Sequence, residues 1–262
     1  MNILSEIIST KREEVGFTKT LIPRSQLRKS EYFYRSCISL YNALVKNDMA
    51  VIAEVKKASP SKGIIRADFD PVAIANSYSL HGASAISVLT DEKYFQGRLE
   101  YLTAIRKSVD LPILRKDFII DSYQLPEAKA AGADAILLIV AALEKSQLQE
   151  LHLEANELGL DVLVEVHNEK EIDVLDFDLV KLIGINNRDL TTFNVDLQTS
   201  FRLRNIIPSH IPVISESGIK NATDIRSLME HDVHAVLIGE TLMRTDDPGK
   251  ALRQLLGEVH GP

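Results

Sequence analysis

Lysines and glutamates stand at the ends of apolar runs in this sequence, where they could exchange protons with a bound molecule. Glu54 and Lys56 end the run AVIAEVK, Lys116 stands in PILRKDF, and Glu165 lies between valines in LVEV. A carboxylate inside an apolar strand must be paired with a cation or hydrogen-bonded, and the two lysines are available as partners. Lysines and glutamates facing each other around one rim would form an acid–base set.

Further polar side chains stand at the ends of the other apolar runs. They are Arg115 and Asp117 beside Lys116, His167 after Glu165, Asn186 and Arg188 in GINNRDL, and Glu216 and Ser217 in SESG. A polar residue at a strand end is ordinary, so each one alone predicts little. As a set they predict a site if the runs are strands of a barrel, whose carboxyl ends carry the chemistry.

Two glycines and one loop suggest a phosphorylated ligand. Gly218 in SESG and Gly239 in LIGE end the last two apolar runs, where barrels often hold a phosphate on backbone N–H groups. The loop KASPSKG after the first run contains Ser59, Pro60 and Ser61. We interpret this loop as a mobile cover over a phosphorylated substrate.

Apolar runs alternate with helical patterns from residue 49 onward. Several runs are continuously hydrophobic, as parallel strands buried on both faces are. The eight runs are AVIAEV, SAISVL, PILRKDF, DAILLIV, DVLVEV, LVKLIGIN, IPVISESG and HAVLIGE, and helical patterns lie at 71–81, 99–108, 122–131, 144–158, 169–175, 197–206 and 222–231. Eight such units predict an α/β fold, a (β/α)8 TIM barrel. A doubly wound open sheet is the competing architecture, but no GxGxxG follows the first run.

The first 48 residues stand outside this alternation. Ile3, Leu4, Ile7 and Ile8 form an apolar stripe at helical spacing, and 33–45 is predicted to be a second helix. We expect residues 1–48 to form an N-terminal helical extension across one end of the barrel. Residues 49–262 are expected to form the barrel, and the whole chain one structural domain.

Composition excludes several classes of protein. The net charge is −7 without a block of lysine or arginine, which argues against a partner that is nucleic acid or an anionic membrane. Cys37 is the only cysteine, so an intramolecular disulfide is excluded and a reducing compartment fits. The charged N-terminal segment is no signal peptide, and no apolar run approaches the length of a membrane span. We therefore expect a cytoplasmic protein.

Seven motifs together resemble the indole-3-glycerol phosphate synthase family. They are EVKKASPSKG, LTDEKYFQG, LRKDFIID, VEVH, GINNRDL, SESGI and VLIGE, in order and at barrel spacing. The resemblance implies a carbon–carbon lyase (carboxy-lyase) of tryptophan biosynthesis. Such an enzyme closes 1-(2-carboxyphenylamino)-1-deoxyribulose 5-phosphate into indole-3-glycerol phosphate, releasing carbon dioxide and water. The resemblance further implies no metal, no organic cofactor, and a monomer open to association with other enzymes of the pathway.

The resemblance also implies roles for individual residues. Lys116 would be the general acid at the substrate ketone, and Glu165 the general base or acid of later proton transfers, assisted by Lys56 and Glu54. Asn186 and Ser217 would orient the intermediate. The implied substrate-binding residues are Ser59, Pro60, Ser61, Phe95, Phe118, Arg188, Leu190, Glu216 and Leu237. Within that set, Arg188 with Ser59 is placed for the carboxylate, and Phe95, Phe118 and Leu190 for the aromatic ring.

The phosphate-binding residues implied are Lys56, Gly218, Gly239 and Glu240. Glu240 is included for its place directly after Gly239. It stands, like His167, where members of the family carry various residues, so neither side chain is given a chemical role.

Three alternatives stay open at this point. A phosphoribosylanthranilate isomerase is disfavoured because Cys37 lies upstream of the first strand, which leaves no thiol base on the rim. A Schiff-base aldolase using Lys116 would be revealed by borohydride trapping. A catalytically silent, ligand-binding barrel is disfavoured because no lysine or glutamate of the rim is replaced.

Overall fold

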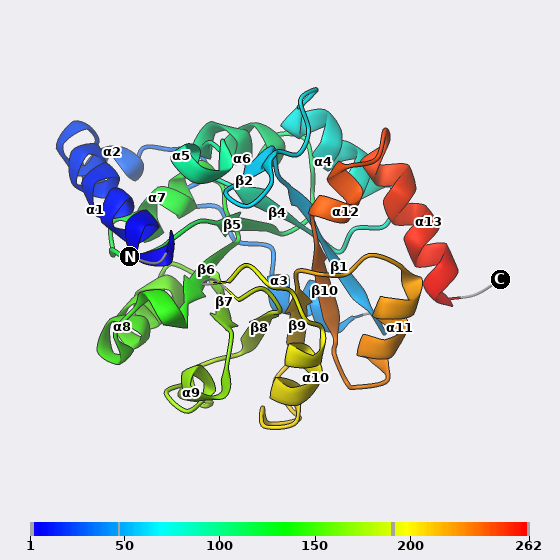
Figure 1. The fold of residues 1–262 in the computed structure, drawn as a ribbon. Helices are drawn as coiled ribbons and strands as arrows, with labels where there is room; N and C mark the ends of the chain where they lie inside the picture. Colours follow the sequence, from blue (N-terminus) through cyan, green and yellow to red (C-terminus); the bar gives the residue numbers. More distant parts are fainter. Residues whose placement is uncertain (1–2, 47, 190–191, 261–262) are drawn as a thin grey trace.

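The structure is a computed structural model and describes residues 3–46, 48–189 and 192–260. Within these residues, eight parallel strands close into a barrel in the order β1-β10-β9-β8-β7-β6-β5-β4 (Figure 1). The strands are β1 (Ala50–Val55), β4 (Ala85–Leu89), β5 (Ile113–Lys116), β6 (Ala135–Ile139), β7 (Asp161–Val166), β8 (Leu182–Asn186), β9 (Val213–Glu216) and β10 (Ala235–Ile238). Each lies in one of the eight apolar runs, so the predicted (β/α)8 TIM barrel is confirmed.

Helices follow the strands and surround them (Figure 1). They are α4 (Pro71–Leu80), α5 (Glu92–Phe95), α6 (Leu99–Arg106), α7 (Gln124–Ala131), α8 (Lys145–Glu157), α9 (Glu169–Ile172), α10 (Gln198–Arg204), α11 (Ala222–Met229), α12 (Glu240–Met243) and α13 (Pro248–His260), with a 3₁₀ turn η1 (Val140–Ala142). The start of α4 shows why the sequence folds this way locally. Asp70 accepts hydrogen bonds from the N–H groups of Val72 and Ala73 at 3.0 Å, and Pro71 occupies the first turn. The last helix, α13, packs against α4 and so completes the outer ring.

The barrel strands are buried on both faces, which explains their continuous hydrophobicity. Along β1, Val51 and Ala53 pack outward with the helices, whereas Ala50 and Ile52 pack into the barrel interior. Because the alternation continues along β1, the side chain of Glu54 points to the same side as Ala50 and Ile52 and lines the cavity.

The N-terminal segment contacts both ends of the barrel rather than one. It contains α1 (Ile3–Leu21), α2 (Arg24–Leu27) and α3 (Leu40–Val45). Leu40 and Leu44 of α3 pack against the interior residues at the N-terminal ends of the strands and close that end. Leu4 and Ile8 of α1 pack with Ile120, beyond the C-terminal end of β5. The expectation of packing across a single end was therefore incomplete.

The helix predicted over 33–45 forms only in its second half, at α3. The preceding residues bond to carboxylates of the barrel instead. The N–H of Ile38 donates to Asp134 Oδ1 at 2.7 Å, and the Ser39 hydroxyl donates to Asp161 Oδ2 at 3.1 Å. Ser39 also caps α3, since its Oγ accepts from the N–H of Asn42. These bonds to distant residues replace the helical ones.

The loop after β1 contains a small antiparallel hairpin that the sequence did not predict. Its strands are β2 (Ala58–Ser59) and β3 (Gly63–Ile64), paired as Ser59 with Gly63 and Ala58 with Ile64. Gly63 has φ 63°, a left-handed conformation that suits glycine. The hairpin holds Pro60 and Ser61 at its tip.

Candidate active site

A cavity of about 550 Å³ opens at the C-terminal ends of the strands, where a TIM barrel carries its active site. The catalytic, substrate-binding and phosphate-binding residues implied by the resemblance all line it where the structure describes them, whereas Arg115 and His167 of the predicted polar set do not. Those that line it are Glu54, Lys56, Ser59, Pro60, Ser61, Phe95, Lys116, Phe118, Glu165, Asn186, Arg188, Glu216, Ser217, Gly218, Leu237, Gly239 and Glu240. Leu190, predicted to enclose the aromatic ring, lies outside the described residues.

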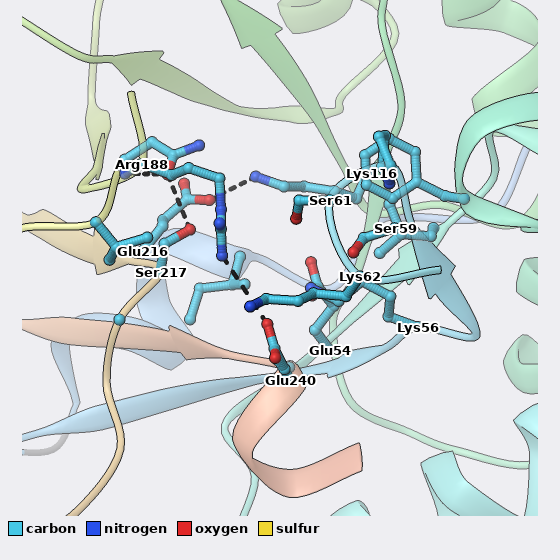
Figure 2. Close-up of a pocket in the computed structure, with 18 of the residues that line it drawn as sticks. Glu54, Lys56, Ser59, Ser61, Lys62, Lys116, Arg188, Glu216, Ser217 and Glu240 are labelled. Carbon is cyan, nitrogen blue, oxygen red and sulfur yellow. Dashed lines mark hydrogen bonds and ion pairs between the residues drawn. The ribbon is translucent and has the colours of Figure 1, made fainter. Parts of the chain in front are cut away.

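Four alternate strands of the barrel each send one charged side chain into the floor of the cavity. β1 carries Glu54, β5 Lys116, β7 Glu165 and β9 Glu216. The Nζ atom of Lys116 lies 2.8 Å from Oε2 of Glu165 and 2.5 Å from Oε2 of Glu216. These two glutamates are each 2% exposed. One ammonium group therefore holds together two buried carboxylates, in the layer that barrels usually fill with branched apolar side chains. Figure 2 shows Lys116 and Glu216 on this floor.

These carboxylates keep Lys116 charged. Burial alone lowers the pKa of Lys116, but Glu165, Glu216 and Glu54 outweigh burial and raise it above its ordinary value. A cation is therefore present at neutral pH where a substrate oxygen could reach it.

The two glutamates titrate differently although they share one lysine. Burial raises the pKa of Glu216; Lys116 opposes this, Glu165 adds to it, and the pKa stands at about 7. For Glu165 burial also raises the pKa, but Lys116 and His167 outweigh it and lower the pKa to about 2. His167 is a second partner for Glu165 and is cationic when protonated, with Nε2 3.4 Å from Oε1. A proton bound by this pair near neutrality therefore resides mainly on Glu216.

A second lysine–glutamate pair lies at the C-terminal end of β1. The Nζ atom of Lys56 lies 2.6 Å from Oε2 of Glu54, whose side chain is buried. The site thus contains two separate ammonium–carboxylate pairs, each able to supply one proton donor beside one acceptor.

Two glycines make room for the carboxylates of the neighbouring strands. A Cβ atom at Gly239 would overlap Oε2 of Glu54, and one at Gly184 would overlap Oε1 of Glu216. Gly184 was missed by the sequence analysis, although a glycine interrupting the strand LIGIN was a visible signal. Gly239 was predicted only as a phosphate contact, and its position beside Glu54 is an additional reason for glycine there.

Asn186 and Ser217 form a polar pair beside Glu165. The Ser217 hydroxyl donates to Asn186 Oδ1 at 2.9 Å, and the side chain of Asn186 helps to lower the pKa of Glu165. Ser217 has φ 68°, a left-handed conformation that is uncommon outside glycine. Such strained residues concentrate at functional sites, and this one turns the hydroxyl toward the cavity residue Asn186.

The cavity lining also contains the two predicted glycines and several cations. The glycines are Gly218 and Gly239, the latter at the start of α12, and the cations include Lys56, Lys62, Lys220 and Arg244. Gly218 has φ 85°, and a Cβ there would come within 2.5 Å of Val195. Backbone N–H groups next to several ammonium groups can bind a phosphate.

Glu240 is an anion within this cationic region. Burial raises the pKa of Glu240, but Arg244 outweighs it, and Lys56 and Lys62 also lower the pKa. Its carboxylate lies 2.8 Å from Arg244 and 3.9 Å from Nη2 of Arg188 (Figure 2). An ionised carboxylate repels phosphate, so only its backbone N–H could serve such a ligand.

Part of the cavity wall is apolar. The rings of Phe95 and Phe118 lie 6.2 Å apart at 39°, and Leu237 lies on the same cavity. The wall also includes residues of α1 that the sequence analysis placed only in a helical stripe, namely Ile3, Leu4 and Ile7. Their role in the cavity had no local signal, because it depends on where α1 docks.

Cys37 lies beside Lys129 and the carbonyl of Ala133, near the N-terminal end of β6 and away from the rim. The part of the chain that the structure describes contains no cluster of three or more histidine, cysteine, aspartate or glutamate residues able to hold a metal ion. No helix in 3–46, 48–189 or 192–260 is long and apolar enough to cross a membrane.

Comparison with known proteins agrees with the geometry of the cavity. The family model described as "Indole-3-glycerol phosphate synthase" matches residues 4–255. A protein of that name from Salinibacter ruber is 49% identical over 260 residues, covering 98% of this chain and 96% of the relative. Another, from Desulfotalea psychrophila, is 48% identical over 261 residues, with coverage of 97% and 98%.

Solved structures of lower identity show the same fold. Thiamine phosphate pyrophosphorylase from Pyrococcus furiosus has a TM-score of 0.60 at 18% identity, covering 85% of this chain and 98% of that chain. KGPDC from Streptococcus mutans has a TM-score of 0.62 at 12% identity, with coverage of 80% and 96%. At these identities the likeness concerns the barrel alone.

Proposed function

The chain belongs to the indole-3-glycerol phosphate synthase family, and from this premise we propose how its residues divide the reaction. The enzyme is a decarboxylating lyase of tryptophan biosynthesis that acts on a phosphorylated small molecule. The observation that carries the proposal is the contact of Lys116 with both Glu165 and Glu216 on the cavity floor.

Lys116 acts first, on the ketone oxygen of the substrate. Ring closure turns this carbonyl into an alcohol and interrupts the aromaticity of the ring, so the step needs a cation, and then a proton, at the oxygen. The ammonium of Lys116 meets this need because the facing carboxylates keep it protonated. Loss of carbon dioxide then restores the aromatic ring.

The final step removes water and needs an acid and a base. The departing hydroxyl must receive a proton, and a neighbouring carbon must lose one. Lys56, paired with Glu54, is the proposed acid, and Glu165 is the proposed base. The low pKa of Glu165 supports this assignment, since the group is ionised and ready to accept a proton at neutral pH.

The rest of the cavity orients the substrate. Arg188 with Ser59 is the proposed contact for the substrate carboxylate, and Phe95 with Phe118 encloses the aromatic ring. Asn186 and Ser217 orient the intermediate, Leu237 contacts the substrate, and Leu190 is proposed to complete the ring pocket. The phosphate is proposed to lie on the backbone at Gly218, Gly239 and Glu240, with Lys56 nearby.

Three further proposals concern the whole protein. A monomer is proposed from the family resemblance. The free thiol of Cys37 supports the cytoplasm as the compartment. Residues 1–48 and 49–262 are proposed to form a single structural domain, and association with other enzymes of the pathway remains a prediction of the family resemblance.

Two substitutions of Lys116 test the proposed chemistry. Lys116→Met removes the cation while keeping the length of the side chain, and indole formation followed by fluorescence should fall by on the order of 10²–10⁴. Lys116→Arg keeps a cation between Glu165 and Glu216, so this variant should retain the fold. Because arginine stays charged but does not give up its proton, its activity shows how much of the effect of Lys116 comes from charge alone.

Thermal melting of both variants serves as the control for folding. A folded Lys116→Met protein that turns over at the wild-type rate would remove Lys116 from the reaction.

A further inference from the structure

His167 is a buried titratable side chain that the proposed reaction does not use. It directly follows β7, and its side chain is 9% exposed. It does not line the cavity but lies behind Glu165, which does. Its Nε2 atom lies 3.4 Å from Glu165 Oε1, and its Nδ1 atom lies 3.2 Å from Glu171 Oε2. The imidazole ring is therefore placed between two carboxylates.

Glu171 fixes the ring from behind. Its Oε2 accepts a hydrogen bond from the peptide N–H of His167 at 2.8 Å, in addition to the contact with the ring. Its Oε1 accepts from Asn168 Nδ2 at 2.6 Å, while Asn168 Oδ1 caps α9 by accepting from the N–H of Glu171. This network leaves Glu171 little freedom, so the orientation of His167 is set by the start of α9.

The other ring nitrogen has no such partner. Nε2 of His167 makes no hydrogen bond among the described residues, and its nearest anionic neighbour is Glu165. A separation of 3.4 Å favours attraction between charges over a formed hydrogen bond. Glu165 is thus held on its Oε2 by Lys116 and on its Oε1 by His167.

The charges around His167 favour its protonated form. The ionisable groups facing the ring are Glu171 on α9, Glu165 on β7 and, further away, Glu216 on β9. Burial lowers the pKa of His167, but these carboxylates outweigh burial and raise the pKa above the ordinary histidine value. The ring is therefore cationic to a higher pH than an ordinary histidine.

We propose that His167, held by Glu171, is a positioning residue that fixes the orientation and charge of Glu165 without touching the substrate. This inference rests on the role proposed above for Glu165. When Lys116 turns toward the substrate ketone, Glu165 loses part of its first cationic contact. His167 remains and keeps the carboxylate ionised and directed at the cavity.

The test compares three glutamine variants. His167→Gln keeps a polar side chain but removes the charge, and Glu171→Gln weakens the support of the ring. His152→Gln is the matched control, because His152 is also buried but lies on α8 beside Asn156, outside the cavity. The values of kcat and KM are measured separately, and the His167 imidazole is titrated by NMR.

A positioning role predicts a specific pattern. His167→Gln should lower kcat on the order of tenfold to a hundredfold, the scale of a misplaced catalytic group, with KM unchanged because His167 does not line the cavity. Glu171→Gln should lower kcat in the same direction and move the NMR titration of His167 to lower pH. His152→Gln should leave kcat unchanged.

Other outcomes overturn the inference. A His167→Gln protein with wild-type kcat and only a lowered Tm would show that the charge of His167 is not needed and that the residue is structural. Should His167→Gln fail to fold, Glu171→Gln carries the test alone.

Glu165→Gln, measured in parallel, separates the two proposals. If it turns over normally, the role of Glu165 fails; if it is inactive while His167→Gln is normal, only the positioning role fails.

Discussion

At the scale of single residues, Lys116 faces more negative charge than one ammonium group can neutralise. Glu54, Glu165 and Glu216 all raise the pKa of Lys116, while Glu216 itself is left with a pKa of about 7. Its Oε1 atom is buried without a hydrogen-bond partner among the described residues. Lys116 is therefore a member of a buried charge cluster, and its removal would leave two carboxylates to take up protons.

Glu216 should make the protein less stable as the pH rises. Its pKa is raised from its ordinary value near 4.5 to about 7 in the folded protein, so the folded protein binds this proton more tightly than the unfolded chain. Its contribution to stability is full below pH 4.5 and is lost as the pH rises through 7. Glu216→Gln imitates the protonated form and does not titrate. The Tm of this variant minus the Tm of the wild type should therefore increase from pH 5 to pH 8, as measured by calorimetry.

Glu165→Gln is the control of opposite sign. The pKa of Glu165 is lowered to about 2, so its stabilising contribution is present above pH 4.5 and lost only toward pH 2. This variant should be less stable than wild type by a constant margin from pH 5 to pH 8. Equal pH dependence in the two variants would contradict the assignment of the raised pKa to Glu216.

At the scale of elements, glycines in and beside the strands help to position the charged groups, because a glycine has no side chain. Gly184 on β8 and Gly239 after β10 leave space for the carboxylates of β9 and β1. This space lets Glu216 of β9 contact Lys116 and Glu54 of β1 contact Lys56. The glycines of the intervening strands determine where those carboxylates point.

Gly184→Ala should displace Glu216 from Lys116. The added methyl group would overlap Glu216 Oε1, and overpacking of this kind costs about 1–3 kcal/mol. We expect a clear loss of kcat in the indole assay together with a lowered Tm. Gly257→Ala is the matched control, because Gly257 in α13 has no atom within 4 Å of the added methyl.

A double variant identifies the cause. Glu216→Ala removes the atoms that the new methyl group would meet, so Gly184→Ala should cost little further stability in that background. If it costs as much as in the wild type, the overlap with Glu216 is not the cause.

At the scale of the whole molecule, one buried lysine ties the N-terminal helix to the rim. Lys11 of α1 is 5% exposed, and its Nζ lies 2.9 Å from Asp91, 3.0 Å from Asp117 and 2.7 Å from Glu14. Asp117 directly follows Lys116 in the chain. The helix that lines the cavity is thus docked through the same segment that carries the proposed acid.

Lys11→Met should destabilise the protein and weaken substrate binding. Removing one partner of a buried ion pair costs on the order of 3–5 kcal/mol, because Asp91 would remain buried without this cation. We expect a lower free energy of unfolding in denaturant titration and a raised KM, since α1 lines the cavity. Arg12→Met, on an exposed position of the same helix, should change stability by less than about 0.5 kcal/mol. Similar stability of the two variants would show that Lys11 does not anchor α1.

The sequence by itself determined the barrel and the inventory of its charged groups. Continuous apolar runs and helical periodicity are local properties, and a strand buried on both faces shows them wherever it lies. The eight runs therefore located the eight strands, and the ends of those strands identified Lys56, Lys116 and Glu165 as residues of one rim.

Only the tertiary structure decided which of these groups meet. Lys116 reaches Glu165 and Glu216 across 49 and 100 positions of the chain, because closure of the barrel brings alternate strands to one floor. The same closure turns Gly184 into a space for Glu216 and brings α1 to the cavity. It also sets Asp134 and Asp161 against Ile38 and Ser39, so the predicted helix begins only at Leu40. Such partners are set by packing over long separations, and no local pattern records them.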